Sequence, residues 1–343
     1  MKTRKQTYNI AAALLMTIAM VACETTIDYK GPETEPKVVI YALLHPDSLV
    51  SVSVSESHSV FRVPYQPRQI TNAIVRLYRD DTLIETLTYE APEPAPDYYP
   101  PNPYSKYVSS AYRPEYGHDY RIEVEVPGFP PARGETRLPA PVTVEVADTS
   151  SIDAGYGYRE MTVKLKFRDP AGEENFYRIT ATSLVGIYTG DKYELYNPEI
   201  PVGVQEADIS YGAQSDPLIA PRQEDDFFDM SLPNMYNIFL DELIPGKEYT
   251  MRLTYNGFYP DTDYFEFLFA WFRLNTITRD LFLYLQSYSA HLHTRDNFLA
   301  EPVPVYTNVT NGLGVVGAMS TTADSLSIGE YPVEGVLYER WYY

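Results

Sequence analysis

The chain has 343 residues, with 27 Lys and Arg against 47 Asp and Glu, a formal net charge of −20. This charge argues against nucleic acid as a partner, and it excludes attachment to an anionic bilayer by electrostatics, because both need clustered cations. The single cysteine excludes an internal disulfide and any cysteine-based zinc or iron–sulfur site.

The first 22 residues have the pattern of a signal peptide. Three cations near the start are followed by an apolar run over residues 10–22, which is too short for a permanent transmembrane helix. The run ends in Met20-Val21-Ala22-Cys23, which resembles a bacterial lipobox. We therefore predict cleavage before Cys23 and lipidation of its thiol and new amino terminus, palmitate being one of the expected acyl chains. The alternative is an ordinary secretory signal with a chance cysteine.

Residues 23–36 are polar and predict a short tether, and the pattern after them predicts an N-terminal β-sandwich over 37–145. Apolar residues fill 38–44, and Val50, Val52 and Val54 alternate with serines. A hairpin is expected around Asp80-Asp81. Short strands between Pro and Gly turns, with no helical period between them, indicate an antiparallel sandwich.

Residues 90–116 interrupt this pattern with seven prolines, interleaved with tyrosines, and predict a long loop. Tyrosine side chains stack on sugar rings or peptide side chains at low entropic cost. We predict ligand or partner contacts by Tyr98, Tyr99, Tyr104, Tyr107 and Tyr112. The alternative is that these tyrosines only cover the sandwich.

The second half, 146–343, predicts a larger β-rich domain with one amphipathic helix. Strands are expected at 161–167 and 176–181, then a pair at 236–240 and 249–255 joined by Pro245-Gly246. Apolar residues at the 3.6-residue period predict a helix over about 276–294, with Thr276 or Thr278 as its N-cap. The tail after it predicts short strands with glycine turns.

The sequence contains no Walker loop, no GxSxG nucleophile elbow and no HExxH motif. Residues 312–317 (GLGVVG) fit the dinucleotide pattern GxGxxG, but the residues after them are poor helix formers, so we predict a glycine-rich β turn. His291 and His293 have poor spacing for a metal, and the acidic residues of 224–229 and of 261–263 predict solvated loops more than calcium sites. We expect no enzyme activity, no cofactor and no metal.

Several segments resemble a family of Bacteroidota outer-membrane lipoproteins known only as a domain of unknown function. The resemblance rests on Cys23 with its tether and on 71–77 (TNAIVRL), 116–122 (YGHDYRI), 127–129 (PGF), 136–139 (TRLP), 169–170 (DP), 175–178 (NFYR), 301–303 (EPV), 306–309 (YTNV) and 311–314 (NGLG). It implies a transthyretin-like or carboxypeptidase-regulatory-like N-terminal sandwich. It also implies genes beside TonB-dependent receptors, and it supplies no catalytic residues.

These patterns together predict a lipid-anchored outer-membrane accessory protein of a TonB-dependent transporter. It would aid capture or gating of an unknown nutrient without catalysis, at the cell surface more than at the periplasmic face. The alternatives are a surface adhesin or structural lipoprotein, or a surface glycosidase or peptidase that needs paired carboxylates in a cleft.

Overall fold

The computed structural model describes most of the chain between residues 35 and 327. The described ranges are 35–57, 68–92, 105–155, 158–187, 204–207, 216–220, 234–257, 265–295 and 303–327. The predicted signal peptide, Cys23 and most of the tether therefore lie outside the described residues. All described strands and the α-helix belong to one compact unit, Lys37–Ser57 with Pro67–Tyr343.

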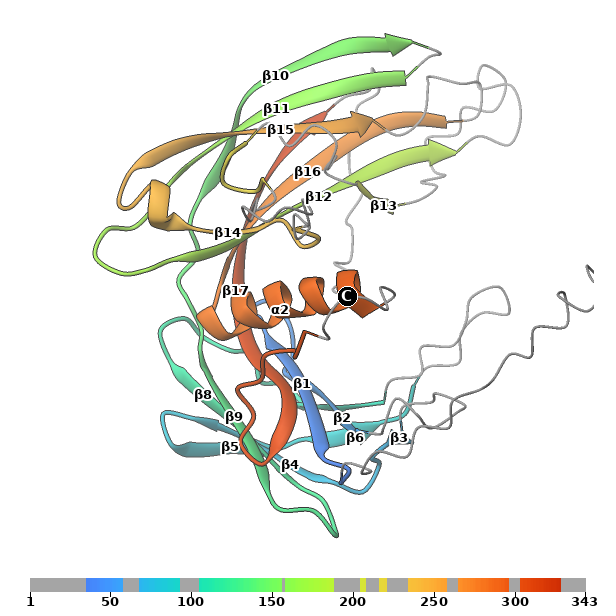
Figure 1. The fold of residues 1–343 in the computed structure, drawn as a ribbon, viewed down its shortest axis with the longest axis vertical. Coiled ribbons are helices and arrows are strands. Elements are labelled where there is room, and N and C mark those ends of the chain that lie inside the picture. The colour runs from blue at the N-terminus through green and yellow to red at the C-terminus, as the bar shows by residue number, and fades with distance from the viewer. Residues whose placement is uncertain are drawn as a thin grey trace, which may run out of the picture. The chain divides into compact units, whose positions relative to one another are not determined.

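The largest sheet within the described residues has ten strands. These are β1 (Val38–Leu44), β2 (Ser51–Glu56), β3 (Arg68–Gln69), β6 (Thr88–Glu90), β7 (Lys106–Val108), β12 (Phe176–Ile187), β13 (Val204–Ala207), β14 (Ile238–Leu240), β16 (Phe265–Ile277) and β17 (Gly312–Ser327). Their order is β13-β12-β16-β17-β1-β2-β7-β6, with β14 paired to β12 and β3 to β2. Figure 1 shows the long strands β12, β16 and β17 of this sheet side by side. The mainly β fold class is thus confirmed.

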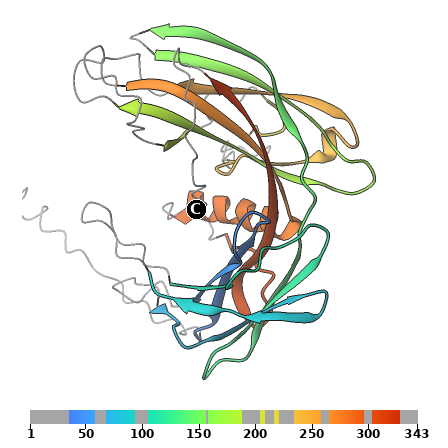
Figure 2. The same ribbon diagram turned by 180° about the vertical axis from the view of Figure 1, so that it is seen from behind.

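Strand β17 joins the first strand of the fold to its later strands. Its first residues pair in parallel with β1, and its later residues pair antiparallel with β16. Figure 2 shows β17 as one long strand, drawn in red. The predicted glycine turn at 312–317 is therefore wrong, as is a tail of short strands, since these glycines lie inside a 16-residue strand. The parallel pairing also makes this sheet mixed.

Two smaller sheets account for the other strands of the described residues. One contains β10 (Val144–Gly155), β11 (Tyr158–Arg168) and β15 (Glu248–Gly257), in the order β10-β11-β15. The other contains β4 (Ile74–Arg79), β5 (Thr82–Thr86), β8 (Asp119–Glu125) and β9 (Ala132–Arg137), in the order β5-β4-β8-β9. The predicted hairpin is confirmed as β4–β5, and both turn residues, Asp80 and Asp81, have positive φ.

Two predictions about strand neighbours need correction. The expected pair 236–240 and 249–255 is not a hairpin, because β14 pairs with β12 while β15 pairs with β11. A short 3-10 helix, Asp241–Leu243, separates them. Strand β7 lies within the predicted loop 90–116, since residues 105–109 contain no proline and can donate to a ladder. The boundary at 145/146 stays a prediction.

Buried side chains of the described residues form separate clusters. In the first, alternate residues of β1 and β2 pack with β4 and β8; Ile40, Val52, Leu77 and Ile122 are fully buried there. In the second, β11 and β15 pack with β12 and β16 through residues such as Leu165. Period-two alternation explains both, because it places one apolar face of each sheet inward.

The helix α2 (Arg279–Arg295) confirms the helix predicted at 276–294. Thr278 is its N-cap: the Leu281 amide donates to the Thr278 hydroxyl at 3.4 Å. Leu281 lies against Gly317 of β17, where an added Cβ would be only 3.0 Å from the Leu281 Cβ. The helix therefore lies directly on the sheet, and Phe282 and Leu285 bury with Phe176.

Candidate functional site

The predicted contact tyrosines occupy different environments. Tyr98, Tyr99 and Tyr104 lie outside the described residues. Tyr107, on β7, is 2% exposed; its hydroxyl donates to the Ile70 carbonyl and accepts from the Ala73 amide, each at 2.9 Å. Burial raises the pKa of Tyr107. Its side chain is thus part of the first core cluster and is closed to a ligand in this structure.

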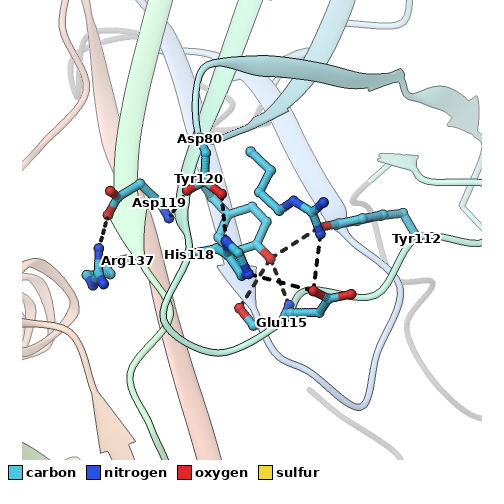
Figure 3. Close-up of polar contacts among 8 residues, drawn as sticks. Asp80, Tyr112, Glu115, His118, Asp119, Tyr120 and Arg137 are labelled. Carbon is cyan, nitrogen blue, oxygen red and sulfur yellow. Dashed lines mark hydrogen bonds and ion pairs between the residues drawn. The ribbon is translucent and has the colours of Figure 1, made fainter.

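Tyr112 belongs to a polar group that we call the corner cluster, shown in Figure 3. Its members come from the β4–β5 turn and from the chain entering β8: Arg79, Asp80, Tyr112, Glu115, His118 and Tyr120. The Tyr112 and Tyr120 hydroxyl oxygens are 3.2 Å apart, and Arg79 lies 6.0 Å over the Tyr112 ring.

Tyr120 holds the backbone that leads into β8. Its hydroxyl accepts from the Glu115 amide at 2.7 Å and donates to the Glu115 carbonyl at 3.2 Å. A tyrosine at the start of a strand, bonded to backbone a few residues upstream, is a known corner device of β-sandwiches. Burial raises the pKa of Tyr120, with the Tyr112 hydroxyl adding to the effect. The bonds at Tyr120 thus have a structural role.

His118 lies between two carboxylates. Its Nδ1 is 2.6 Å from an Asp80 oxygen, and its Nε2 is 3.7 Å from Glu115. Asp80 also accepts from the Asp119 amide at 3.1 Å, so it bridges the hairpin turn and β8. The hydrogen bond from His118 is the largest cause of a lowered pKa at Asp80, followed by the Asp119 amide.

We predict that Asp80→Asn lowers stability modestly at pH 7 and that this difference shrinks toward pH 3. The folded pKa of Asp80 lies below its unfolded value, so its contribution is present above the unfolded pKa and is lost as pH falls through the folded pKa. Both side chains are partly exposed, which keeps the effect small. Thermal unfolding at several pH values tests this against Glu90→Gln, an exposed control. A difference that grows toward pH 3 contradicts it.

A second group, which we call the tyrosine–arginine cluster, lies around α2: Tyr41, Arg178, Tyr236, Tyr284 and Tyr288. Tyr284 and Tyr288 are one helical turn apart and stack, with ring centroids at 5.8 Å and an interplanar angle of 15°. Tyr236 stacks on Tyr288 at 6.4 Å, and Tyr41 tilts against Tyr284 at 6.1 Å.

Arg178 of β12 contributes the positive charge of this cluster. Its guanidinium carbon lies 5.7 Å from the Tyr236 ring centroid, a cation–π contact. Burial raises the pKa of Tyr41, and the charge of Arg178 opposes that rise. Burial also raises the pKa of Tyr284, and the hydroxyls of Tyr41, Tyr288 and Tyr236 add to it. The guanidinium and the phenol groups are thus close enough to interact electrostatically.

The sequence pattern does not predict this cluster. The helical period gave Tyr284 and Tyr288 the same role as the leucines of the apolar stripe. Tyr41 lies on the opposite face of β1 from the buried Ile40 and Ala42, and it is 43% exposed. The cluster could have been found from two features: a tyrosine at an outward position of a strand, Tyr41, and two tyrosines one turn apart on a helix, Tyr284 and Tyr288.

Most of the chain matches the model of a protein family. The model of the family described as "Domain of unknown function (DUF4249)" matches residues 24–325. The chain belongs to this family. No curated protein matches it.

The DUF4249 domain includes both clusters, since residues 41–288 lie within the matched range. Among the residues that the structure describes, no three His, Cys, Asp or Glu side chains are grouped to hold a metal ion. His291 instead contacts the Val303 carbonyl through its Nδ1 at 2.8 Å. The acidic residues of 224–229 and 261–263 lie outside the described residues.

Proposed function

We propose that this protein is a lipid-anchored outer-membrane accessory protein of a TonB-dependent transporter, which captures a nutrient or gates its entry without catalysis. The lipobox at Cys23 carries the proposal, because lipid at the first mature residue places the whole folded chain at a membrane. The family match begins one residue later, at residue 24. We place the protein on the cell surface in preference to the periplasmic face.

No helix among the described residues is both long and apolar enough to span a bilayer. One structural observation supports the proposed role. The tyrosine–arginine cluster offers aromatic faces, hydroxyl groups and a guanidinium at one place, a combination suited to reversible recognition. Tyr98, Tyr99 and Tyr104 stay predicted contacts of the same role.

We also propose that the N-terminal part is a transthyretin-like or carboxypeptidase-regulatory-like sandwich. In support, β1 and β2 share one buried cluster with β4 and β8, which belong to another sheet. Two sheets that pack face to face over common apolar residues make a sandwich.

The test is co-purification from detergent-solubilised membranes of the native host. We expect an affinity-tagged chain to recover a TonB-dependent transporter in stoichiometric amount. A tagged lipoprotein of similar size and abundance is the control for nonspecific recovery. Recovery of no transporter, or equal recovery by the control, overturns the proposal.

Cys23→Ser should move the protein out of the membrane fraction almost completely. Each buried methylene of an acyl chain contributes about 0.8 kcal/mol, so loss of the lipid removes the anchor. Fractionation and immunoblotting measure the change, and Thr25→Ser, two residues later, is the matched control. Retention of the serine variant in the membrane fraction contradicts lipid anchoring. Protease treatment of intact cells then tests surface exposure.

A further inference from the structure

Arg178 carries a buried polar atom without a partner. Its Nε is buried and makes no hydrogen bond within the described part of the chain. No ion pair of Arg178 occurs among the described residues either. An unsatisfied buried donor destabilises the fold, so its presence calls for an explanation.

We propose that the tyrosine–arginine cluster binds a carboxylate-bearing saccharide. Arg178 takes the carboxylate, and the hydroxyls of Tyr41, Tyr284 and Tyr288 bond to the hydroxyls of the sugar rings. This inference rests on the proposed function, because it names the chemical class of the captured nutrient.

The charge of the site indicates an anionic ligand. The protein carries a formal net charge of −20, yet this guanidinium lies over the Tyr236 ring and forms no ion pair with a carboxylate among the described residues. A guanidinium presents its donors in a planar fork that matches a carboxylate, and charge-assisted bonds of this type are about twice as strong as neutral ones. The ligand thus supplies the negative charge that the described protein residues do not.

The phenol groups favour a ligand with many hydroxyls. The rings of Tyr41, Tyr284 and Tyr288 contact one another or Tyr236, and within the described residues their hydroxyls form no hydrogen bond. A ligand with an apolar ring would cover these hydroxyls and leave them unsatisfied, which weakens binding. A sugar ring satisfies them and also packs its C–H face on tyrosine. An acidic saccharide fits both requirements.

The arginine is held in place by the sheet and by a chain of hydrogen bonds. Arg178 lies between Ile238 of β14 and Asn275 of β16 in the ladder. Asn275 donates to the Arg178 carbonyl at 3.0 Å and accepts from Thr321 at 2.7 Å, and buried His45 lies 3.0 Å from Thr321. A site on rigid strands loses little freedom when a ligand binds.

The tyrosines of the cluster are also held in place by the fold. Tyr236 sits in a turn closed by Asn234, whose side chain accepts from the Ile238 amide at 3.0 Å and donates to the Ile238 carbonyl at 2.8 Å. Tyr284 and Tyr288 are on α2, which is capped by Thr278 and packed on β17. The rings and the guanidinium are thus presented by regular elements and one closed turn.

Calorimetric titration of the detergent-solubilised full chain tests the inference. The probes are α-1,4-linked trigalacturonate and its full methyl ester, which has the same rings and hydroxyls but no charge. We expect the acid to bind at least about tenfold more tightly than the ester. Arg178→Gln should remove this preference, while Arg68→Gln, an exposed arginine paired with Glu56, should keep it.

A second variant separates the hydroxyls from the charge. The double change Tyr284→Phe with Tyr288→Phe should weaken acid and ester equally, since both probes use the same hydroxyl contacts. If Arg178→Gln fails to fold, Arg178→Lys replaces it, because lysine keeps the positive charge. Lysine lacks the planar fork of the guanidinium, so the preference for the acid over the ester should be smaller than in the unchanged protein. Circular dichroism checks the fold of each variant.

Equal affinity for acid and ester, or no binding of either, overturns the inference. So does an unchanged preference in Arg178→Gln. The titration needs no transporter, so a failed co-purification leaves this result standing. Conversely, a failed titration leaves a recovered transporter complex standing and removes only the ligand class.

Discussion

Gly314→Ala should lower the free energy of unfolding by about 2–5 kcal/mol. Gly314 pairs with Ile40 where β17 runs parallel to β1, and its φ is +101°. An added Cβ would overlap the Ile40 carbonyl oxygen and lie 2.9 Å from its carbonyl carbon. The left-handed backbone costs an alanine about 1–2 kcal/mol, and forcing the strands apart costs about 1–3 more.

The matched control for this prediction is Gly128→Ala. Gly128 also has a positive φ, +89°, but nothing lies within 4 Å of an added Cβ. It should lose only the backbone contribution, about 1–2 kcal/mol. Urea unfolding monitored by tyrosine and tryptophan fluorescence measures both variants. Equal losses would show that backbone conformation alone, and not contact with β1, makes glycine necessary at 314.

The environment of Gly314 explains why a turn was wrongly predicted at residues 312–317. Glycines favour turns when only local conformation is considered. Here the need for glycine comes from Ile40, which precedes Gly314 by more than 270 residues in the chain. A requirement imposed by so distant a strand has no signal in the local pattern, so a turn was predicted where a strand lies.

Elements fixed by local patterns were predicted well. The run 38–44 coincides with β1, because alternate residues of it are buried. The Asp80-Asp81 turn and the Thr278 cap were also found, since turn and cap residues act within three or four positions. In contrast, β14 and β15 were paired wrongly because Pro245-Gly246 indicates a turn but not which strands it joins.

The tyrosine–arginine cluster could not be predicted from the sequence for a related reason. Tyr41, Arg178, Tyr236 and the two helix tyrosines come from four separate elements or turns, and only the fold brings them together. The tyrosines of 90–116 drew attention because they cluster in sequence. Of the five predicted contact tyrosines, the structure describes two: Tyr107 fills a core and Tyr112 joins the corner cluster.

We expect Asp169→Ala to lower the free energy of unfolding by roughly 3 kcal/mol. Asp169 is 2% exposed, and its carboxylate accepts from the Tyr177 hydroxyl at 2.6 Å and from the Gly246 amide at 2.7 Å. It thereby ties the start of β12 to the turn before β15. Hydrogen bonds to charged groups are worth about 1.5–3 kcal/mol each, and alanine leaves both donors without this acceptor.

Two comparisons show whether this loss comes from the buried bonds. Tyr177→Phe should cost less than Asp169→Ala, because Gly246 still satisfies part of the carboxylate, and the double variant should cost less than the sum. Asp148→Ala removes an exposed pair with Lys164 at 2.7 Å and should change stability far less, since water replaces the partner. Chemical unfolding measures all four variants. Additive losses at 169 and 177 would mean that the two side chains stabilise the fold independently, and that Asp169 does not act through the Tyr177 hydroxyl.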